Sequence, residues 1–187
     1  MIDQKRIDHI ERTINRLFDH AEAFSGHCFR CVKPKYGNSL DAFSGEGSLK
    51  VSGRFHVRGN VRLVYTSTDL NTAQWEYCNT ARSTGLSIAS LLPFTAVSAA
   101  VNLNKVLNLS DTKVRRSLKI TLVEIRENWN GSPEETVTQL IGQLAYEAGF
   151  EAILAPSADG QNLNIIRQNL RPDSSLQIIN KSELPAR

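Results

Sequence analysis

The sequence predicts an α+β fold in which mixed, mostly antiparallel short strands form sheets with flanking helices. Three observations predict this class. The chain opens with an amphipathic helical pattern, the β-branched stretches that follow are short, and strands and helices lack the regular alternation of a doubly wound fold. A chain of 187 residues has the length of one domain. It buries about 70% of its unfolded surface, so it folds without a metal or disulfide staple.

The amphipathic opening predicts a helix over residues 2–24. Isoleucine, leucine and alanine recur there at three- and four-residue steps, with charges between them, and Ser25-Gly26 provides a stop signal. We therefore divide the chain into an N-terminal helical extension, residues 1–26, and a main domain, residues 27–187.

The main domain contains short elements bounded by capping and turn residues, and a loop rich in glycine and serine over residues 36–60. The expected strands are 27–32, 61–66, one near 95–103, 152–155, 163–167 and 176–179. The expected helices are 69–82, begun by Ser67; 111–117, begun by Ser110; one after a capping box at Thr121; and one from Ser132-Pro133 to Gly149.

Composition and charge exclude several functional classes. The net charge is +3, and the pI of about 8.8 stays below the ~9 typical of a nucleic-acid-binding domain. The longest apolar stretch, residues 86–101, contains Pro93 and several serines and falls short of the ~20 residues of a membrane span. The charged N-terminus does not match a secretory signal. We expect a cytoplasmic protein that binds no membrane.

The cysteines do not predict a metal or redox site. Cys28 and Cys31 have C-x-x-C spacing, but side chains three residues apart in a strand point to opposite faces and do not easily share an ion. We expect them to be small buried hydrophobic residues with reduced thiols. The dinucleotide fingerprints and the G-x-S-x-G elbow are absent from the sequence.

Several side chains have both a structural and a functional interpretation. Arg30 lies in an apolar strand, where a guanidinium either pairs with a carboxylate or faces an anion-binding site. Tyr65 is either a core aromatic residue or a ring that covers a ligand. Glu76 falls at the flank of its helix, where it is either solvated or lines a cleft. Gly53 and Ser157 supply ordinary turns or contacts to a ligand.

The order of these segments resembles the RES domain family. The first half of the resemblance consists of Phe29-Arg30, Gly45-Glu46-Gly47-Ser48, Ser52-Gly53-Arg54-Phe55, Val64-Tyr65-Thr66-Ser67 and Ala73-Gln74-Trp75-Glu76. The second half consists of residues 106–111, Thr138-Gln139, residues 147–150, residues 153–158, Gly160, Asn162 and Leu163. The family is named for an Arg, a Glu and a Ser, which correspond here to Arg30, Glu76 and Ser157.

The resemblance implies a toxin of a bacterial toxin–antitoxin pair, with an ADP-ribosyltransferase-like fold and its catalytic domain in residues 27–187. Described members degrade NAD by hydrolysis or phosphorolysis, or ADP-ribosylate a protein. NAD is then the substrate, and no metal is required. The expected partner is an Xre-like antitoxin, and the expected assembly is a homo-oligomer or a toxin–antitoxin complex.

The resemblance also implies roles for individual residues. The catalytic set is Glu76, Arg30 and Tyr65: the carboxylate stabilises positive charge on the ribose, the guanidinium binds the pyrophosphate or a ribose-linked group, and the aromatic ring covers the ribose or nicotinamide. The substrate-binding set is Arg30, Gly53, Arg54, Tyr65 and Ser157. His56 and Cys31 depart from the family pattern, which often has Asn and sometimes an aromatic residue at these positions.

Three functions follow from these observations. The first is an enzyme that cleaves the nicotinamide–ribose bond of NAD with water or phosphate as acceptor. The alternative is a protein mono-ADP-ribosyltransferase that acts on a protein target. The third is a non-enzymatic nucleic-acid- or protein-binding module, suggested by the mild basicity and by Lys113, Arg115 and Arg116, although such a cluster is usually a solvated helix face.

Overall fold

The computed structural model of the protein describes residues 2–38, 42–83, 85, 87–127, 129, 134–158 and 160–184. The strands are β1 (Glu22–Val32), β2 (Leu63–Ser67), β3 (Phe94–Asn108), β4 (Ala152–Pro156), β5 (Gln161–Ile166) and β6 (Ser175–Leu184). The helices of the described residues are α1 (Gln4–Asp19), α3 (Leu70–Ser83), α4 (Thr112–Leu118), α5 (Leu122–Arg126) and α6 (Val137–Ala148). None of them is long and apolar enough to cross a membrane.

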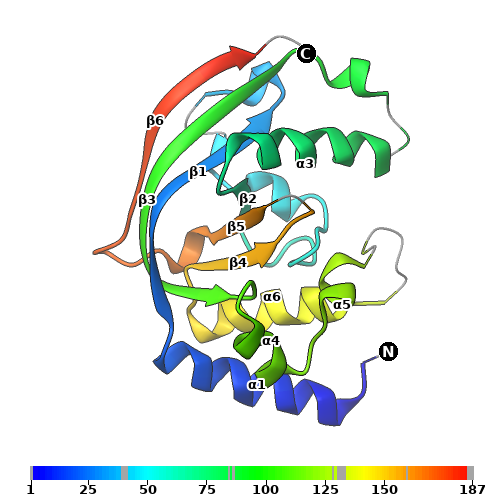
Figure 1. The fold of residues 1–187 in the computed structure, drawn as a ribbon, viewed down its shortest axis with the longest axis vertical. Helices are drawn as coiled ribbons and strands as arrows, with labels where there is room; N and C mark the ends of the chain where they lie inside the picture. Colours follow the sequence, from blue (N-terminus) through cyan, green and yellow to red (C-terminus); the bar gives the residue numbers. More distant parts are fainter. Residues whose placement is uncertain are drawn as a thin grey trace.

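The strands form one sheet in the order β1-β2-β5-β4-β3-β6. Strand β3 pairs β1 along one edge, and along the other edge it pairs β6 with its first part and β4 with its last residues. Because β1 also pairs β2 at Phe29 and Ser67, the pairings close on themselves through β5 and β4. Figure 1 shows β1, β3 and β6 as a tall curved layer beside the shorter strands.

The expected mixed and mostly antiparallel pairing is confirmed, and β3 with β4 is the parallel pair among the described strands. The expectation of short strands throughout is wrong, because β1 has 11 residues and β3 has 15. Their length follows from mutual pairing: β1 adds Glu22 to Gly26 to the expected strand because these residues pair with β3. Tertiary pairing therefore outweighs the local turn signal of Ser25-Gly26.

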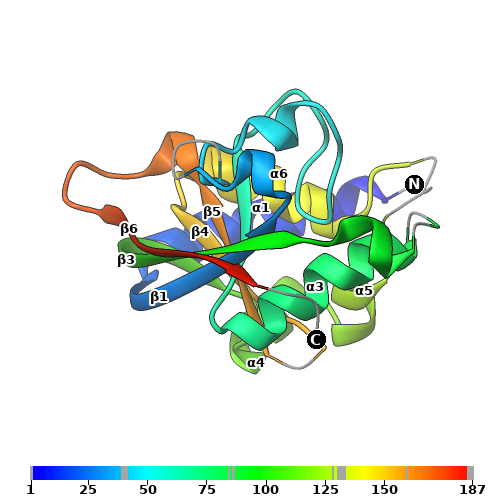
Figure 2. The same ribbon diagram turned by 90° about the horizontal axis from the view of Figure 1, so that it is seen from above.

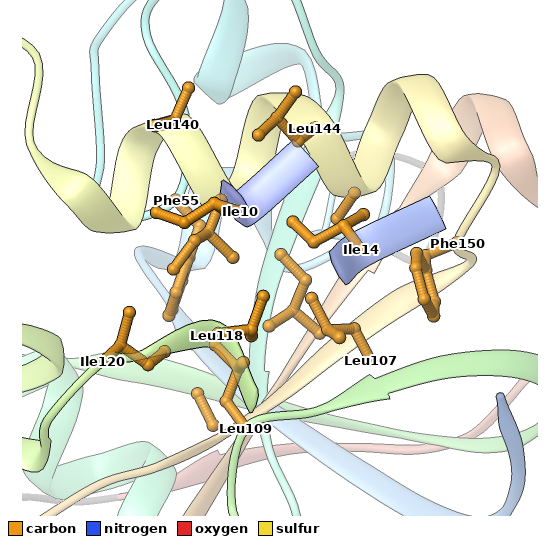
Figure 3. Packing of buried hydrophobic residues seen from close by; sticks show 14 of the residues in the cluster. Ile10, Ile14, Phe55, Leu107, Leu109, Leu118, Ile120, Leu140, Leu144 and Phe150 are labelled. Atoms are coloured by element: carbon orange, nitrogen blue, oxygen red, sulfur yellow. The ribbon is translucent and has the colours of Figure 1, made fainter. Parts of the chain in front are cut away.

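Helix α1 ends at Asp19, five residues before its expected end, and it packs into the main core. Ile10 and Ile14 are fully buried in a cluster that also contains Leu107 of β3 and Leu144 of α6. Figure 3 shows these side chains packed together. The division of the chain between residues 26 and 27 stays a prediction, but the helix shares its core with the rest of the protein.

The helix boundaries depend on which polar side chain caps each helix. The capping box of Thr121 with Glu124 is confirmed, and Gly149, at φ 92°, ends α6 as expected. Helix α4 is capped by Asp111 and not by Ser110. Helix α6 is capped by Thr136; the expected cap at residues 132–133 lies outside the described residues.

The helices occupy two regions. In Figure 1, α3 lies near one end of the long strands, whereas α1, α4 and α6 gather at the other end. Figure 2, viewed from above, places α3 on one side of the β1–β3–β6 layer and the loops that precede β2 on the other side. Helix α3 contacts β1, β2 and β5, so it is the helix that can bring a side chain over the ends of the short strands.

Candidate functional site

The carboxylate of Glu76 reaches from α3 to the ends of β4 and β5. Ser157 Oγ donates a hydrogen bond to Glu76 Oε1 over 2.6 Å, and Asn162 Nδ2 donates to the same oxygen over 2.7 Å. Ser157 directly follows β4 and is 6% exposed, whereas Glu76 is half-buried. The structure therefore brings the predicted Glu76 and Ser157 into direct contact, and adds Asn162 to them.

The three strands beneath Glu76 share one face that changes from apolar to polar toward the same end. Ser67 of β2 and Ala155 of β4 are both paired with Asn162 of β5. Since alternate residues of a strand share a face, Tyr65 and Ser67 lie on that face, and so does Ser157, two residues after Ala155. The apolar end of the face joins the main core, and the polar end lies under the helix.

The turn between β4 and β5 packs closely against the start of α3. A Cβ atom on Gly160 would lie 2.4 Å from Thr72 Oγ1, so this position requires glycine. Asp69 binds the start of the helix by accepting the N–H of Thr72 over 2.8 Å. The expected cap, Ser67, instead donates its hydroxyl hydrogen to Asn162 Oδ1 over 2.8 Å. This close packing fixes the height of Glu76 above the sheet.

Tyr65 is held by a second group of contacts on the same face. Its hydroxyl oxygen accepts the N–H of Phe55 over 3.0 Å and lies 2.9 Å from Nδ1 of His56. The other ring nitrogen, Nε2, lies 2.8 Å from the carbonyl of Val51, which can only accept. Nε2 therefore carries the proton, and Nδ1 accepts the Tyr65 hydroxyl hydrogen. Any contact of Tyr65 with a substrate would use its ring.

Burial favours the neutral forms of both partners. Desolvation lowers the pKa of His56 and raises the pKa of Tyr65. Gly53 makes the pairing possible, since a Cβ atom there would lie 2.4 Å from Tyr65 Oη and 2.6 Å from His56 Cε1. The carbonyl of Gly53 is bound by Gln139 Nε2 over 3.0 Å. Gly53 therefore leaves the space that the Tyr65 hydroxyl occupies, and His56 holds that hydroxyl by a hydrogen bond.

Arg54 links this second group to Glu76. Its Nη1 donates to the carbonyls of Ile125 and Glu127, at the end of α5. Desolvation lowers the pKa of Arg54, and the nearby charge of Glu76 acts in the opposite direction. Arg126 Nη2 donates to the carbonyl of Ser157 over 3.1 Å, so a second guanidinium binds the residue whose hydroxyl contacts Glu76.

Arg30 is not joined to these groups. The alternation along β1 places Phe29 on the face of its partner Ser67, and Arg30 on the opposite face with Cys28 and Val97. Arg30 is half-buried, and its guanidinium makes no hydrogen bond or ion pair with another described residue. Desolvation lowers its pKa to about 10, so it stays charged at neutral pH. An unpaired cation in this position favours an anionic ligand.

The cysteines and the basic cluster of the sequence do not form a second site among the described residues. Cys28 and Cys31 are buried and free, and burial raises the pKa of Cys28 to about 11 and that of Cys31 to about 12. Neither is a thiolate nucleophile at neutral pH. Within the described part of the chain, no three His, Cys, Asp or Glu residues are grouped to hold a metal. In the basic cluster, Arg115 is occupied by the carbonyls of Leu109 and Ser110.

Sequence reasoning did not single out Ser67 and Asn162 as parts of the site. Ser67 was expected as a helix cap and as part of a family segment, and Asn162 as part of a family segment, but neither was given a role in the site. A usable signal exists: the strand segments that contain Tyr65, Asn162 and Ile153 each become polar at one end. Which ends meet depends on the register of the sheet, and the order β2-β5-β4 is not the order of the sequence.

Comparisons with known proteins agree with this architecture. The model of the RES domain family matches residues 27–185. The structure is similar to a chain in the crystal structure of the M. tuberculosis MbcT–MbcA toxin–antitoxin complex, with a TM-score of 0.74, 20% sequence identity and 94% of each chain covered. At this identity the likeness shows a common fold. No curated protein matches the sequence significantly.

Proposed function

The chain belongs to the RES domain family, and on that premise we propose that it cleaves the bond between nicotinamide and ribose in NAD, with water or phosphate as the acceptor. One observation carries the proposal: the carboxylate of Glu76 is held through Oε1 by Ser157 and Asn162, beside the guanidinium of Arg54. A fixed carboxylate with a guanidinium nearby suits a substrate that combines a ribose with a pyrophosphate.

The proposed reaction needs stabilisation of positive charge more than it needs a strong acid. As the C–N bond breaks, its electron pair leaves with the nicotinamide, which becomes neutral, and positive charge develops on the ribose. Glu76 stabilises that charge. An oxygen of water or phosphate then forms the new bond to the ribose carbon, and the attacking water releases its proton to solvent. Removing one such electrostatic group typically slows a reaction by about 10²–10³-fold.

The remaining residues would bind and orient the substrate. Among the described residues, Arg54 donates hydrogen bonds through Nη1, and its other N–H groups would donate to a phosphate oxygen. The ring of Tyr65 would pack on the ribose or nicotinamide, and Gly53 keeps that ring in place. Ser157 holds Glu76 directly. The role of Arg30 in binding stays a prediction from the family resemblance, because it lies on the other face of β1.

The biological context of the proposal is a toxin–antitoxin pair with an ADP-ribosyltransferase-like toxin. The similar M. tuberculosis structure is of a toxin–antitoxin complex, and we extend that arrangement to this chain, with an Xre-like antitoxin as the partner. Induced expression in a bacterial host should then stop growth, and the Glu76→Gln variant should relieve the arrest at equal protein level. Growth arrest by both proteins alike would contradict the proposal.

The direct test is incubation of the purified protein with NAD, with and without phosphate, followed by chromatography of the products. We expect release of nicotinamide that is lost in Glu76→Gln. The matched control is Glu147→Gln, on the exposed surface of α6, where the carboxylate accepts a hydrogen bond from Gln143. Dependence of the rate on phosphate, with a phosphorylated ribose product, identifies phosphorolysis; ADP-ribose without that dependence identifies hydrolysis.

Other outcomes separate the alternatives. Folded protein that releases no nicotinamide from NAD contradicts the proposal. If radiolabel from the adenylate part of NAD then appears on a protein in a cell extract, the chain is a mono-ADP-ribosyltransferase. Retention on a polyanion resin above moderate salt, without either reaction, would favour the non-enzymatic binding module.

A further inference from the structure

Asn162 lies at the centre of a chain of hydrogen bonds that ends at Glu76. Its Oδ1 accepts the hydroxyl hydrogen of Ser67 over 2.8 Å, and its Nδ2 donates to Glu76 Oε1 over 2.7 Å. Ser67 and Asn162 are direct partners in the β2–β5 pairing. The Ser67 hydroxyl is 2% exposed with the rest of its residue, so the sheet itself fixes the first link of the chain.

The orientation of the Asn162 amide follows from the charge of its neighbour. If the amide were turned over, Oδ1 would face Glu76 Oε1 at the same short distance, and two acceptors would repel each other. With the amide as observed, both of its ends are satisfied by protein groups. Ser67 completes the arrangement because its hydroxyl can donate to Oδ1.

Asn162 and Ser157 are different kinds of donor. The hydroxyl of Ser157 can rotate and either donate or accept, so its direction is not fixed by its own chemistry. The amide nitrogen of Asn162 can only donate, and the other end of the amide is held by Ser67. Asn162 is therefore the partner that fixes the position of Oε1.

We propose that Asn162, oriented by Ser67, is a positioning residue that holds the Glu76 carboxylate in place. This inference rests on the proposed function. One N–H of the amide is directed to Glu76 and its oxygen accepts the hydroxyl of Ser67, so Asn162 acts on the reaction through Glu76. Its loss should therefore lower kcat and change KM little.

The kinetic test uses Asn162→Asp, which keeps the shape of the side chain and replaces the donor with an acceptor. We expect kcat for nicotinamide release to fall about 10- to 100-fold, as for the loss of a hydrogen bond to a charged group. KM should stay within about twofold, because the substrate-binding groups are unchanged. Ser67→Ala should lower kcat by only about two- to fivefold.

The matched control is Asn104→Asp. Asn104 also pairs with a serine hydroxyl, that of Ser174, over 3.0 Å, but its side chain has no link to Glu76. This variant should keep the wild-type kcat and KM. Wild-type kcat in Asn162→Asp, or a loss that appears in KM and not in kcat, would overturn the proposal.

A second measurement does not depend on activity. In the ¹H–¹⁵N NMR spectrum, the side-chain amide signal of Asn162, assigned by its loss in Asn162→Asp, should shift in Glu76→Gln, whereas that of Asn104 should not. An Asn162 signal that ignores Glu76→Gln overturns the inference. If the wild-type protein releases no nicotinamide, the proposed function fails, and the amide signal alone then decides whether Asn162 holds Glu76.

Discussion

Glu151 and Glu76 are both carboxylates held by several hydrogen bonds, yet their surroundings differ. Glu151, at the start of β4, is fully buried and accepts three backbone N–H groups, those of Asn104, Lys105 and Arg171. Glu76 is half-buried and accepts hydrogen bonds from two side chains, Ser157 and Asn162. Glu151 joins separate segments of the backbone, whereas Glu76 is held by side chains.

The difference separates stability from chemistry. Backbone N–H groups are present whatever the sequence, so a carboxylate that satisfies them stabilises the fold where β3 and the residues after β5 meet. Side-chain donors require specific residues, and the two that bind Glu76 do not connect backbone segments in the way that the donors to Glu151 do. Both donors bind one oxygen of Glu76, and Arg54 lies nearby. This arrangement fixes the position of that oxygen more than it stabilises the fold.

The largest expected effect comes from removing the structural carboxylate. Glu151→Ala removes the acceptor of three part-buried backbone N–H groups and should lower the free energy of unfolding by about 2–4 kcal/mol. Urea denaturation followed by circular dichroism measures this change. Exposed Glu147→Ala is the control and should change it by less than about 0.5 kcal/mol. An equally small effect at Glu151 would show that the comparison is wrong.

Removing the charge of Glu76 should lower the activity and leave the stability almost unchanged. Glu76→Gln should lower kcat for nicotinamide release by about 10²–10³-fold. The free energy of unfolding should change by less than about 1 kcal/mol, since the amide keeps an oxygen for Ser157 and Asn162. Steady-state kinetics and urea denaturation on the same preparation test both halves. A Glu76→Gln variant that loses stability but keeps its activity per folded molecule would show that Glu76, like Glu151, has a structural role.

Two glycines of one loop sharpen the comparison further. Gly53→Ala should cost about 1–3 kcal/mol of unfolding free energy and raise KM, because the added Cβ atom displaces Tyr65 and His56. Gly47→Ala is the matched control, since a Cβ atom there meets nothing within 4 Å. Thermal unfolding and KM for NAD distinguish them. Equal effects of the two substitutions would mean that the close packing of Tyr65 against Gly53 and His56 does not matter for stability or for NAD binding.

The smallest expected effect is a pH dependence from His56. Burial places the pKa of His56 below its ordinary value of 6.5 in the folded state, so the unfolded state binds more protons as the pH falls through that value. The free energy of unfolding should therefore decrease between pH 7.5 and 5.5. In His56→Asn that slope should be smaller, because the titrating group is gone. Identical slopes in wild type and variant would refute the neutral His56–Tyr65 pairing.

Local signals predicted much of the fold. The capping box of Thr121 and the stop at Gly149 were confirmed because the side chain and the backbone conformation that decide them are local. The end of α1 and the length of β1 were not predictable, because they depend on pairing with β3, more than sixty residues later.

The candidate site divides in the same way. The family resemblance singled out Glu76 and Ser157, which the structure joins over 2.6 Å. It gave no role to Ser67 and Asn162, because their contribution exists only once β5 lies between β2 and β4. It also grouped Arg30 with Glu76, whereas the alternation along β1 places Arg30 on the other face. A strand pattern predicts which residues share a face, but not which strand becomes the neighbour.

The most direct test of the account measures nicotinamide release from NAD per folded molecule for the wild type, Glu76→Gln and Glu151→Gln, with the folded fraction determined by urea denaturation of each. We predict that Glu76→Gln loses its activity and keeps its stability, and that Glu151→Gln loses stability while each folded molecule keeps near wild-type activity. Full activity in folded Glu76→Gln would contradict the account, as would a folded wild-type protein that leaves NAD intact.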